Sequence, residues 1–405
     1  MNKTLKIFFA AVLCVAVAAC QSKDNHGTGD LTAAQKEMKA AVENYVPQVV
    51  YGTYKALADE TQNLYEGLSA ACEKGVDQLS QADVDAVCST FLLARKYWEQ
   101  SEAFLYGPAT TFGIDPHIDT WPLDVEALAV SLGNAAQVKM LEGEDGIAYA
   151  GAKLGQELLG FHGIEFILFR DGANRSVAAL KAAEDDEAFA KVNVSGAQEL
   201  VYAAAVAGDL RDNCYRLYAA WNPAAESKYL ARLEEIEAEI EINGKVYGEN
   251  LLGAAQLGSS FETWEEAVST ILVGGCSNIC AEVADVKMGN AHTGEDVNYI
   301  ESPYSEKSFQ DFIDNILSIQ FTLYGSRDAS APGQNSLYGA MANLGYSGTA
   351  ALKTKLEAAL NALKACQAKG AFVKIYADSS VQDAMDAVSA LDQELNKAAE
   401  WIVKQ

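Results

Sequence analysis

His162 and Glu165 are the two residues of this sequence whose types and spacing could most directly support chemistry. They lie three positions apart in the apolar segment 158–169, and residues three apart face the same side of a helix. An imidazole and a carboxylate placed together can ligate a metal ion or transfer a proton. Burying them unpaired would cost free energy, so the alternative interpretation is a structural pair that satisfies itself inside the core.

Gly160, His162 and Glu165 form the pattern Gly-x-His-x-x-Glu, which resembles the GxHxxE motif of the imelysin-like family, whose members are described as peptidases. Other segments resemble the same family in the same order along the chain: Arg95 to Pro108 (with Trp98, Glu102 and Gly107), Trp121-Pro122-Leu123-Asp124, Glu301-Ser302-Pro303-Tyr304-Ser305, and Asp311 with Asn315. One departure is Gly163, where the family more often has alanine. This glycine lowers helix propensity without removing a ligand.

The resemblance implies a fold, a place for the site and a broad role. It implies two helical-bundle domains with the site at their junction, and a role linked to iron acquisition outside the cytoplasm. The charged residues in the family-like segments become candidate neighbours of the His162–Glu165 pair, namely Arg95, Glu102, Asp124 and Glu301. The residues that would support the motif are Gly160, Trp121, Ser302 and Ser305.

Each of these neighbours also has a structural interpretation. Arg95 and Glu102 could form an ion pair on a helix surface or between domains. Asp124 and Glu301 could cap the helices that follow them. Trp121 could be a core or interface aromatic residue.

The chemistry of the site has three interpretations. A zinc peptidase needs three protein ligands, an open coordination position and a general base, and the HExxH motif is absent. Because the chain has only four histidines, most ligands beside His162 would be carboxylates, which suit iron or another divalent metal better than catalytic zinc. We therefore expect a protein that binds iron or an iron-containing ligand. The alternatives are a metallopeptidase that uses His162 and Glu165, and an interaction module whose site is structural.

The first residues predict export and lipid attachment. Lys3 and Lys6 precede the apolar run 7–18, and Val17-Ala18-Ala19-Cys20 supplies small residues before a cysteine. This arrangement resembles the lipobox of bacterial lipoproteins, so we expect residues 1–19 to be a signal peptide, Cys20 to carry lipid and residues 20–30 to form a tether. The alternative is a plain signal peptide with a chance cysteine. The expected location is the outer membrane, facing the periplasm or the cell surface, with components of an iron-uptake transporter as partners.

The amino-acid composition narrows the classes of partner that we expect for this protein. The chain of 405 residues has a formal net charge of −26, which argues against nucleic acid as a partner because that needs clustered lysine and arginine. No segment after the leader is expected to be long and apolar enough to span a membrane. Cys72 and Cys88 flank an expected helix connection and are the best disulfide pair. We interpret Cys276 and Cys280 either as buried small residues or as a redox pair.

Helical spacing of apolar residues dominates the chain and predicts an all-α protein. The expected helices cover 34–71 with a kink at Pro47, 81–105, 154–169, 197–221, 226–241, 262–289, 307–324, 350–369 and 382–403. Residues 107–151 are expected to form a long irregular connection. Segment 160–169 can be laid over 315–324, which favours a duplication and predicts domains at 31–222 and 223–405.

Overall fold

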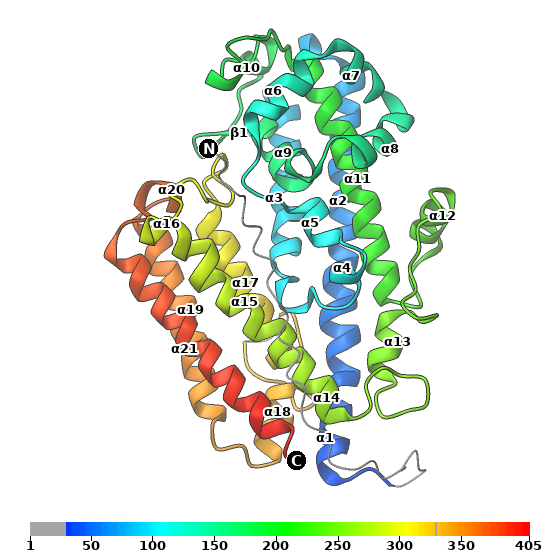
Figure 1. Ribbon diagram of the computed structural model, residues 1–405, viewed down its shortest axis with the longest axis vertical. Helices are drawn as coiled ribbons and strands as arrows, with labels where there is room; N and C mark the ends of the chain where they lie inside the picture. The colour runs from blue at the N-terminus through cyan, green and yellow to red at the C-terminus, as the bar shows by residue number, and fades with distance from the viewer. Residues whose placement is uncertain (1–29, 329) are drawn as a thin grey trace, which may run out of the picture. The chain divides into compact units, whose positions relative to one another are not determined.

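The protein is built almost entirely of helices, which confirms the all-α prediction (Figure 1). The computed structural model describes residues 30–328 and 330–405. The signal peptide, Cys20 and all of the predicted tether except Asp30 lie outside the described residues. Residues 31–405 form one compact unit, and the predicted division at residue 222, like the duplication, stays a prediction.

The first half of this unit contains long helices connected by short ones. Its α-helices are α1 (Ala33–Tyr45), α2 (Gly52–Lys74), α3 (Gln81–Glu99), α4 (Pro108–Thr111), α5 (Ile114–Ile118), α6 (Val125–Gly133), α7 (Ala135–Met140), α8 (Gly143–Lys153), α9 (Gly160–Leu168), α10 (Val177–Lys181) and α11 (Gly196–Trp221). The π-helical turn η1 (Val46–Tyr51) contains Pro47 and joins α1 to α2. The 3₁₀ turns are η2 (Val76–Gln78), η3 (Glu102–Phe104), η4 (Gln156–Leu158) and η5 (Glu187–Phe189). The short strands β1 (Phe169–Arg170) and β2 (Ala173–Asn174) pair antiparallel, with Phe169 opposite Asn174.

The second half has the same character. Its α-helices are α12 (Ser227–Glu235), α13 (Tyr247–Leu252), α14 (Trp264–Ser269), α15 (Asn278–Ala281), α16 (Gly289–Thr293), α17 (Ser308–Tyr324), α18 (Leu337–Asn343), α19 (Thr349–Lys369), α20 (Phe372–Ile375) and α21 (Ser379–Ile402). The π-helical segments η6 (Thr270–Ser277) and η7 (Glu282–Met288) connect α14, α15 and α16 into one continuous helical run.

The long helices pack into two groups that meet. Helix α2 lies between α3 and α11, while α19 packs against α17 and α21 (Figure 1). The groups are joined where α3 contacts α17 and where η3 contacts η6. Helix α1 comes first in the chain but packs against α14 and α18 from the second half, so the halves share a continuous apolar core.

The expected irregular connection at 107–151 is wrong, because this segment folds into α4 to α8. The helices α4, α5, α6 and α7 have 4, 5, 9 and 6 residues, which is shorter than the stretch over which an apolar period is recognised, whereas α8 has 11. Their ends are nevertheless encoded locally: Pro108 occupies the first turn of α4, and the side chains of Asp124 and Asn134 cap α6 and α7. The predicted helix at 154–169 starts only at Gly160, because Gly155 and Gly160 both adopt positive φ.

Two other expectations fail. The helical run Trp264–Thr293 is long and apolar enough to cross a membrane by length and composition, although 61% of its most apolar window is buried inside the protein, as in a core helix. Cys72 and Cys88 are both free thiols, so the predicted disulfide is wrong. Cys88 is buried instead, and its Sγ lies 3.5 Å from the carbonyl oxygen of Leu168. Cys276 and Cys280 are free and buried, as small core residues are.

Gly163 has a packing reason in the structure. The Tyr202 hydroxyl donates a hydrogen bond of 2.7 Å to the carbonyl oxygen of Leu158, just before α9. A Cβ atom on Gly163 would lie 2.1 Å from that hydroxyl oxygen. The glycine therefore leaves room for a tyrosine that ties α11 to the start of α9.

We expect Gly163→Ala to lower the free energy of unfolding by about 1–3 kcal/mol, the usual cost of an overpacked core, although alanine is the better helix former. Adding Tyr202→Phe removes the clashing oxygen, so the double variant should be more stable than Gly163→Ala alone. Urea denaturation of the two single variants and the double variant measures this coupling. A stabilising Gly163→Ala substitution would show that this account of α9 is incorrect.

Candidate metal centre

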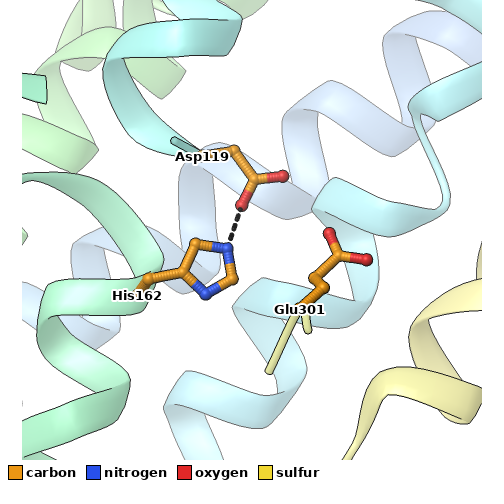
Figure 2. A group of neighbouring side chains, drawn as sticks. All are labelled: Asp119, His162 and Glu301. Carbon is orange, nitrogen blue, oxygen red and sulfur yellow. Dashed lines mark ion pairs between the residues drawn. The ribbon is translucent and has the colours of Figure 1, made fainter. Parts of the chain in front are cut away.

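Asp119, His162 and Glu301 converge from three separate segments of the chain (Figure 2). Asp119 directly follows α5, His162 lies near the start of α9, and Glu301 belongs to the connection between α16 and α17. The Nε2 atom of His162 lies 3.0 Å from Oδ1 of Asp119. One ligand atom from each of the three residues lies within 4.8 Å of the other two, so the three could hold one cation together.

Gly160 allows α5 and α9 to come this close. Its φ is +68°, a conformation that other residues rarely adopt. A Cβ atom on Gly160 would lie 1.8 Å from the carbonyl oxygen of Ile118, the residue before Asp119. The glycine of the motif therefore places the Asp119 carboxylate against the His162 ring.

The other side of the imidazole faces Glu165, as the spacing predicted. Nδ1 of His162 lies 3.5 Å from Oε2 of Glu165. The second carboxylate oxygen of Glu165 accepts two hydrogen bonds of 2.7 Å, from the backbone N–H and the hydroxyl of Ser305. Ser302, in the same connection, is buried and has a positive φ of 49°. The segment with Glu301 thus fixes Glu165 as well.

Arg95 is the central cation of the site. Its Nη1 pairs with Asp119, and its Nη2 lies 2.6 Å from Oε1 of Glu99 and 2.7 Å from Oε1 of Glu301. The indole N–H of Trp98 donates to the second oxygen of Asp119 at 2.7 Å. Helix α3 therefore supplies two of the groups that orient Asp119, and His162 from α9 is a third.

Lys287 is a second buried cation and comes from η7. Its Nζ lies 3.1 Å from Glu301, 3.7 Å from Glu99 and 3.8 Å from Glu102. This lysine is 1% exposed, so its charge is neutralised by the carboxylates around it and not by water.

Acidic groups exceed basic ones in this buried site. We call the whole set the acidic cluster. Its buried carboxyl groups are Glu99, Glu102, Asp119, Glu165, Glu301 and Asp311, its half-buried ones are Asp115 and Glu282, and its basic groups are Arg95, His162 and Lys287. Among the described side chains, Oε2 of Glu301 and Oδ2 of Asp311 are buried without a hydrogen-bond partner. An uncompensated buried carboxylate is costly, and a bound cation would offset that cost.

The protonation of the cluster follows from this imbalance. Burial opposes the charge on His162, but hydrogen bonds to Asp119 and Glu165 outweigh it and raise the His162 pKa to about 9. Burial raises the pKa of Glu99 to about 7 against the attraction of Arg95 and Lys287. Burial and the neighbouring Glu282 raise the pKa of Asp115 to about 7. Burial also opposes ionisation of Asp119, but Arg95 and His162 hold the Asp119 pKa well below its ordinary value.

The donor set fits a cation that prefers oxygen with one nitrogen ligand. Two carboxylates and an imidazole suit iron or another first-row divalent metal, whereas structural zinc sites favour cysteine and histidine. A second group, Glu99, Glu102 and Asp119, shares Asp119 with the first. His162 must lose a proton to become a ligand, so cation binding here would release protons.

The family model for imelysin, Peptidase_M75, matches residues 50–398. This chain belongs to the imelysin family. The match covers both halves of the helical unit and every residue of the acidic cluster, so the resemblance of the GxHxxE segment extends over most of the chain.

Similar proteins of known sequence or structure agree with this membership. This imelysin is 26% identical to iron-regulated protein A of Synechococcus elongatus over 274 residues, which are 68% of this chain and 61% of that relative. Its fold matches a crystal structure described as an iron-regulated protein A precursor from Parabacteroides distasonis, with a TM-score of 0.72, 23% identity, and coverage of 92% of this chain and 96% of that one. An imelysin-like protein from Psychrobacter arcticus matches with a TM-score of 0.53, 12% identity, and coverage of 93% and 97%.

The structure of this imelysin brings together most of the residues that the sequence suggested. Arg95, Glu102, His162, Glu165 and Glu301 all belong to the acidic cluster. Asp124 does not: it is exposed and accepts a hydrogen bond from the N–H of Ala127, so it caps α6, as its structural interpretation allowed. Trp121 packs against Tyr299 with ring centroids 4.0 Å apart, as an interface aromatic would.

Five members of the acidic cluster were missed, namely Glu99, Asp115, Asp119, Glu282 and Lys287. Asp119 lies in the segment expected to be irregular, where no pattern distinguished it from other acids. Glu99 stands four residues after Arg95 in a predicted helix, a spacing that signals an ion pair. Lys287 shares its predicted helix with the acidic residues Glu282 and Asp285, so no local signal distinguished it as a buried cation.

We expect the metal-free protein to lose stability as pH rises from about 5 to 9. His162, Glu99 and Asp115 have folded-state pKa values above their ordinary ones, so each stabilises the fold while it keeps its proton. That contribution is complete below the ordinary pKa and is lost as pH passes about 7 for the two carboxyls and about 9 for His162. Each proton changes the free energy of unfolding by roughly 1.4 kcal/mol per pH unit in its window.

Urea denaturation at pH 5, 7 and 9 would measure this loss. Glu99→Gln should flatten the change between pH 5 and 7, whereas Asp386→Asn, at an exposed position on α21, should leave the profile as in the wild type. Stability that is constant or increasing over this range would contradict the expected protonation.

Proposed function

We propose that this imelysin is a lipid-anchored extracytoplasmic protein that binds iron, or an iron-containing ligand, through Asp119, His162 and Glu301. The observation that carries the proposal is the convergence of these three donors within 4.8 Å, in a buried cluster with more acid than base. An excess of buried carboxyl groups over basic groups lowers the stability of the fold. A bound cation would offset that loss, so binding explains why the excess is kept.

Two arguments favour iron as the cation, namely the chemistry of the donor set and the names of two similar proteins. Oxygen-rich donor sets with one imidazole suit iron, which is a borderline to hard cation. The Synechococcus relative and the Parabacteroides structure are both called iron-regulated protein A, and we carry that relation to iron over to this chain as part of the proposal.

The metallopeptidase alternative is less well supported by the geometry. A zinc peptidase needs a carboxylate that is free to take a proton from the attacking water. One oxygen of Glu165 accepts two hydrogen bonds from Ser305, and the other faces His162. Glu165 therefore serves better as an orienting partner of the imidazole, as carboxylates commonly do beside metal-bound histidines.

Ferrous iron binding to purified protein, measured anaerobically by calorimetry and metal analysis, tests the proposal. His162→Ala and Glu301→Gln should each weaken binding by at least about 10–100-fold, since even outer partners of metal ligands have effects of that size. Asp124→Asn is the matched control, because it changes a carboxylate of the same family-like pattern that the structure places at a helix cap. Its affinity should equal that of the wild type.

Two outcomes would contradict the proposal. One is a wild-type protein that binds no iron; the other is unchanged affinity in correctly folded His162→Ala and Glu301→Gln variants. Cleavage of a peptide panel that stops with His162→Ala and with a chelator would favour the metallopeptidase instead.

The anchor and its setting are the remaining part of the proposal. Lipid on Cys20 would hold the protein at the outer membrane, close to components of an iron-uptake transporter. Cys20→Ser should move the protein from the membrane fraction to the soluble fraction of the producing bacterium, because one residue carries the whole lipid attachment. Fractionation by centrifugation followed by blotting measures this, and unchanged membrane association would argue against lipidation at Cys20.

A further inference from the structure

Glu99, Glu102 and Asp119 form a second group of buried ligand atoms beside the first group, which consists of Asp119, His162 and Glu301. In each group, one ligand atom of every residue lies within 4.8 Å of the other two. Asp119 belongs to both groups, and in sites that hold two metal ions the ions lie only about 3.5–4 Å apart. By number and spacing, the carboxylates of the acidic cluster would therefore suit a pair of cations.

Lys287 lies where the second cation of such a pair would be. Its Nζ is 3.7 Å from Oε2 of Glu99 and 3.8 Å from Oε1 of Glu102, the two carboxylates that belong to the second group alone. It also donates a hydrogen bond of 3.1 Å to Oε1 of Glu301, a member of the first group. The ammonium therefore supplies a positive charge to the second group from within the protein.

Glu102 shows that the ammonium satisfies this group only loosely. Hydrogen bonds from nitrogen to oxygen are about 2.7–3.2 Å long, so the contact of 3.8 Å is an ion pair without a hydrogen bond. Within residues 30–328 and 330–405, the buried Glu102 carboxylate accepts no hydrogen bond, and Lys287 is its one ion-pair partner. The cluster meets solvent at its half-buried carboxyl groups, Asp115 and Glu282. Glu102 is thus a buried ligand group that a stronger cation could still engage.

We propose that Lys287 is a built-in cation that limits this site to a single metal ion. Lys287 and Arg95 both contact Oε1 of Glu301, while Oε2 of Glu301 has no hydrogen-bond partner among the described groups. The inference rests on the proposed function, because it takes Asp119, His162 and Glu301 as the ligands of that single ion. It also separates this protein from hydrolases, aminopeptidases among them, that need two metal ions for their reaction.

Removal of the lysine charge tests the proposal on the full-length chain. The probe is Mn²⁺, which prefers oxygen ligands and is counted by its paramagnetic resonance signal. Lys287→Gln should bind one Mn²⁺ more per chain than the wild type. Lys287→Gln/Glu102→Gln should lose that additional ion, because the second group then lacks one carboxylate. The matched control is Lys369→Gln, which removes a lysine from an exposed ion pair of 2.9 Å with Asp378 and should bind as many ions as the wild type.

The stability of the variant gives a second measurement. Lys287→Gln removes one of the buried cations that hold the carboxylates together, so it should be less stable than the wild type in metal-free buffer. Mn²⁺ should restore that stability, because a ligand that binds only the folded state stabilises it. Thermal denaturation followed by circular dichroism, with and without Mn²⁺, measures both effects. A Lys287→Gln chain that stays unfolded in Mn²⁺ would overturn the proposal, since the metal ion should replace the ammonium.

Four counts of bound Mn²⁺ would also overturn it. These are two ions in the wild type, equal numbers in Lys287→Gln and the wild type, an additional ion in Lys369→Gln, and an additional ion that remains in Lys287→Gln/Glu102→Gln.

The counts separate this proposal from the proposed function. If the wild type binds no cation and Lys287→Gln binds one, the first group fails as a metal site, whereas the ammonium of Lys287 does occupy the second. If the wild type and Lys287→Gln each bind one, the proposed function stands and the role of Lys287 is refuted.

Discussion

The buried pairing of Arg95 with three carboxylates links three separate segments of the chain to a single guanidinium. Asp119, Glu99 and Glu301 come from the end of α5, from α3 and from the connection before α17, and one guanidinium contacts all three. The planar fork of arginine suits this role, whereas a lysine ammonium would offer a single charged centre. Lys287 adds that single centre on the other side of Glu301. The two cations together keep an acid-rich interior folded without fully neutralising it.

This incomplete neutralisation shapes the proposed function. A fully paired cluster would be a structural network with nothing left to attract a ligand. Here the orphaned oxygens of Glu301 and Asp311 belong to carboxyl groups that the protein itself does not fully satisfy. In the proposed function, a bound cation would complete these carboxyl groups and offset the cost in stability of leaving them unsatisfied.

The sequence predicted those parts of the fold and site that have local signals. Long helices such as α11 and α21 have apolar periods that continue for many turns, and their observed bounds lie close to the expected ones. His162 and Glu165 were identified by spacing, and Arg95, Glu102 and Glu301 by resemblance to a family pattern. Asp119 could not be found in this way, because its role depends on α5 meeting α9 at Gly160. That contact is tertiary, and only the folded chain expresses it.

The two π-helical segments between Trp264 and Thr293 have a consequence for how this family is compared across species. Each π-helical turn holds one residue more than an α-helical turn, so the faces of the helix rotate relative to a regular pattern. Lys287 lies within η7, and its direction toward Glu301 therefore depends on how many residues precede it as well as on its identity. In a homologue with one residue fewer in this helix, all the remaining residues could be identical. The helix would nevertheless present a different side chain to the site. The number of residues in this helix therefore determines which side chain faces the site, independently of the identity of those residues.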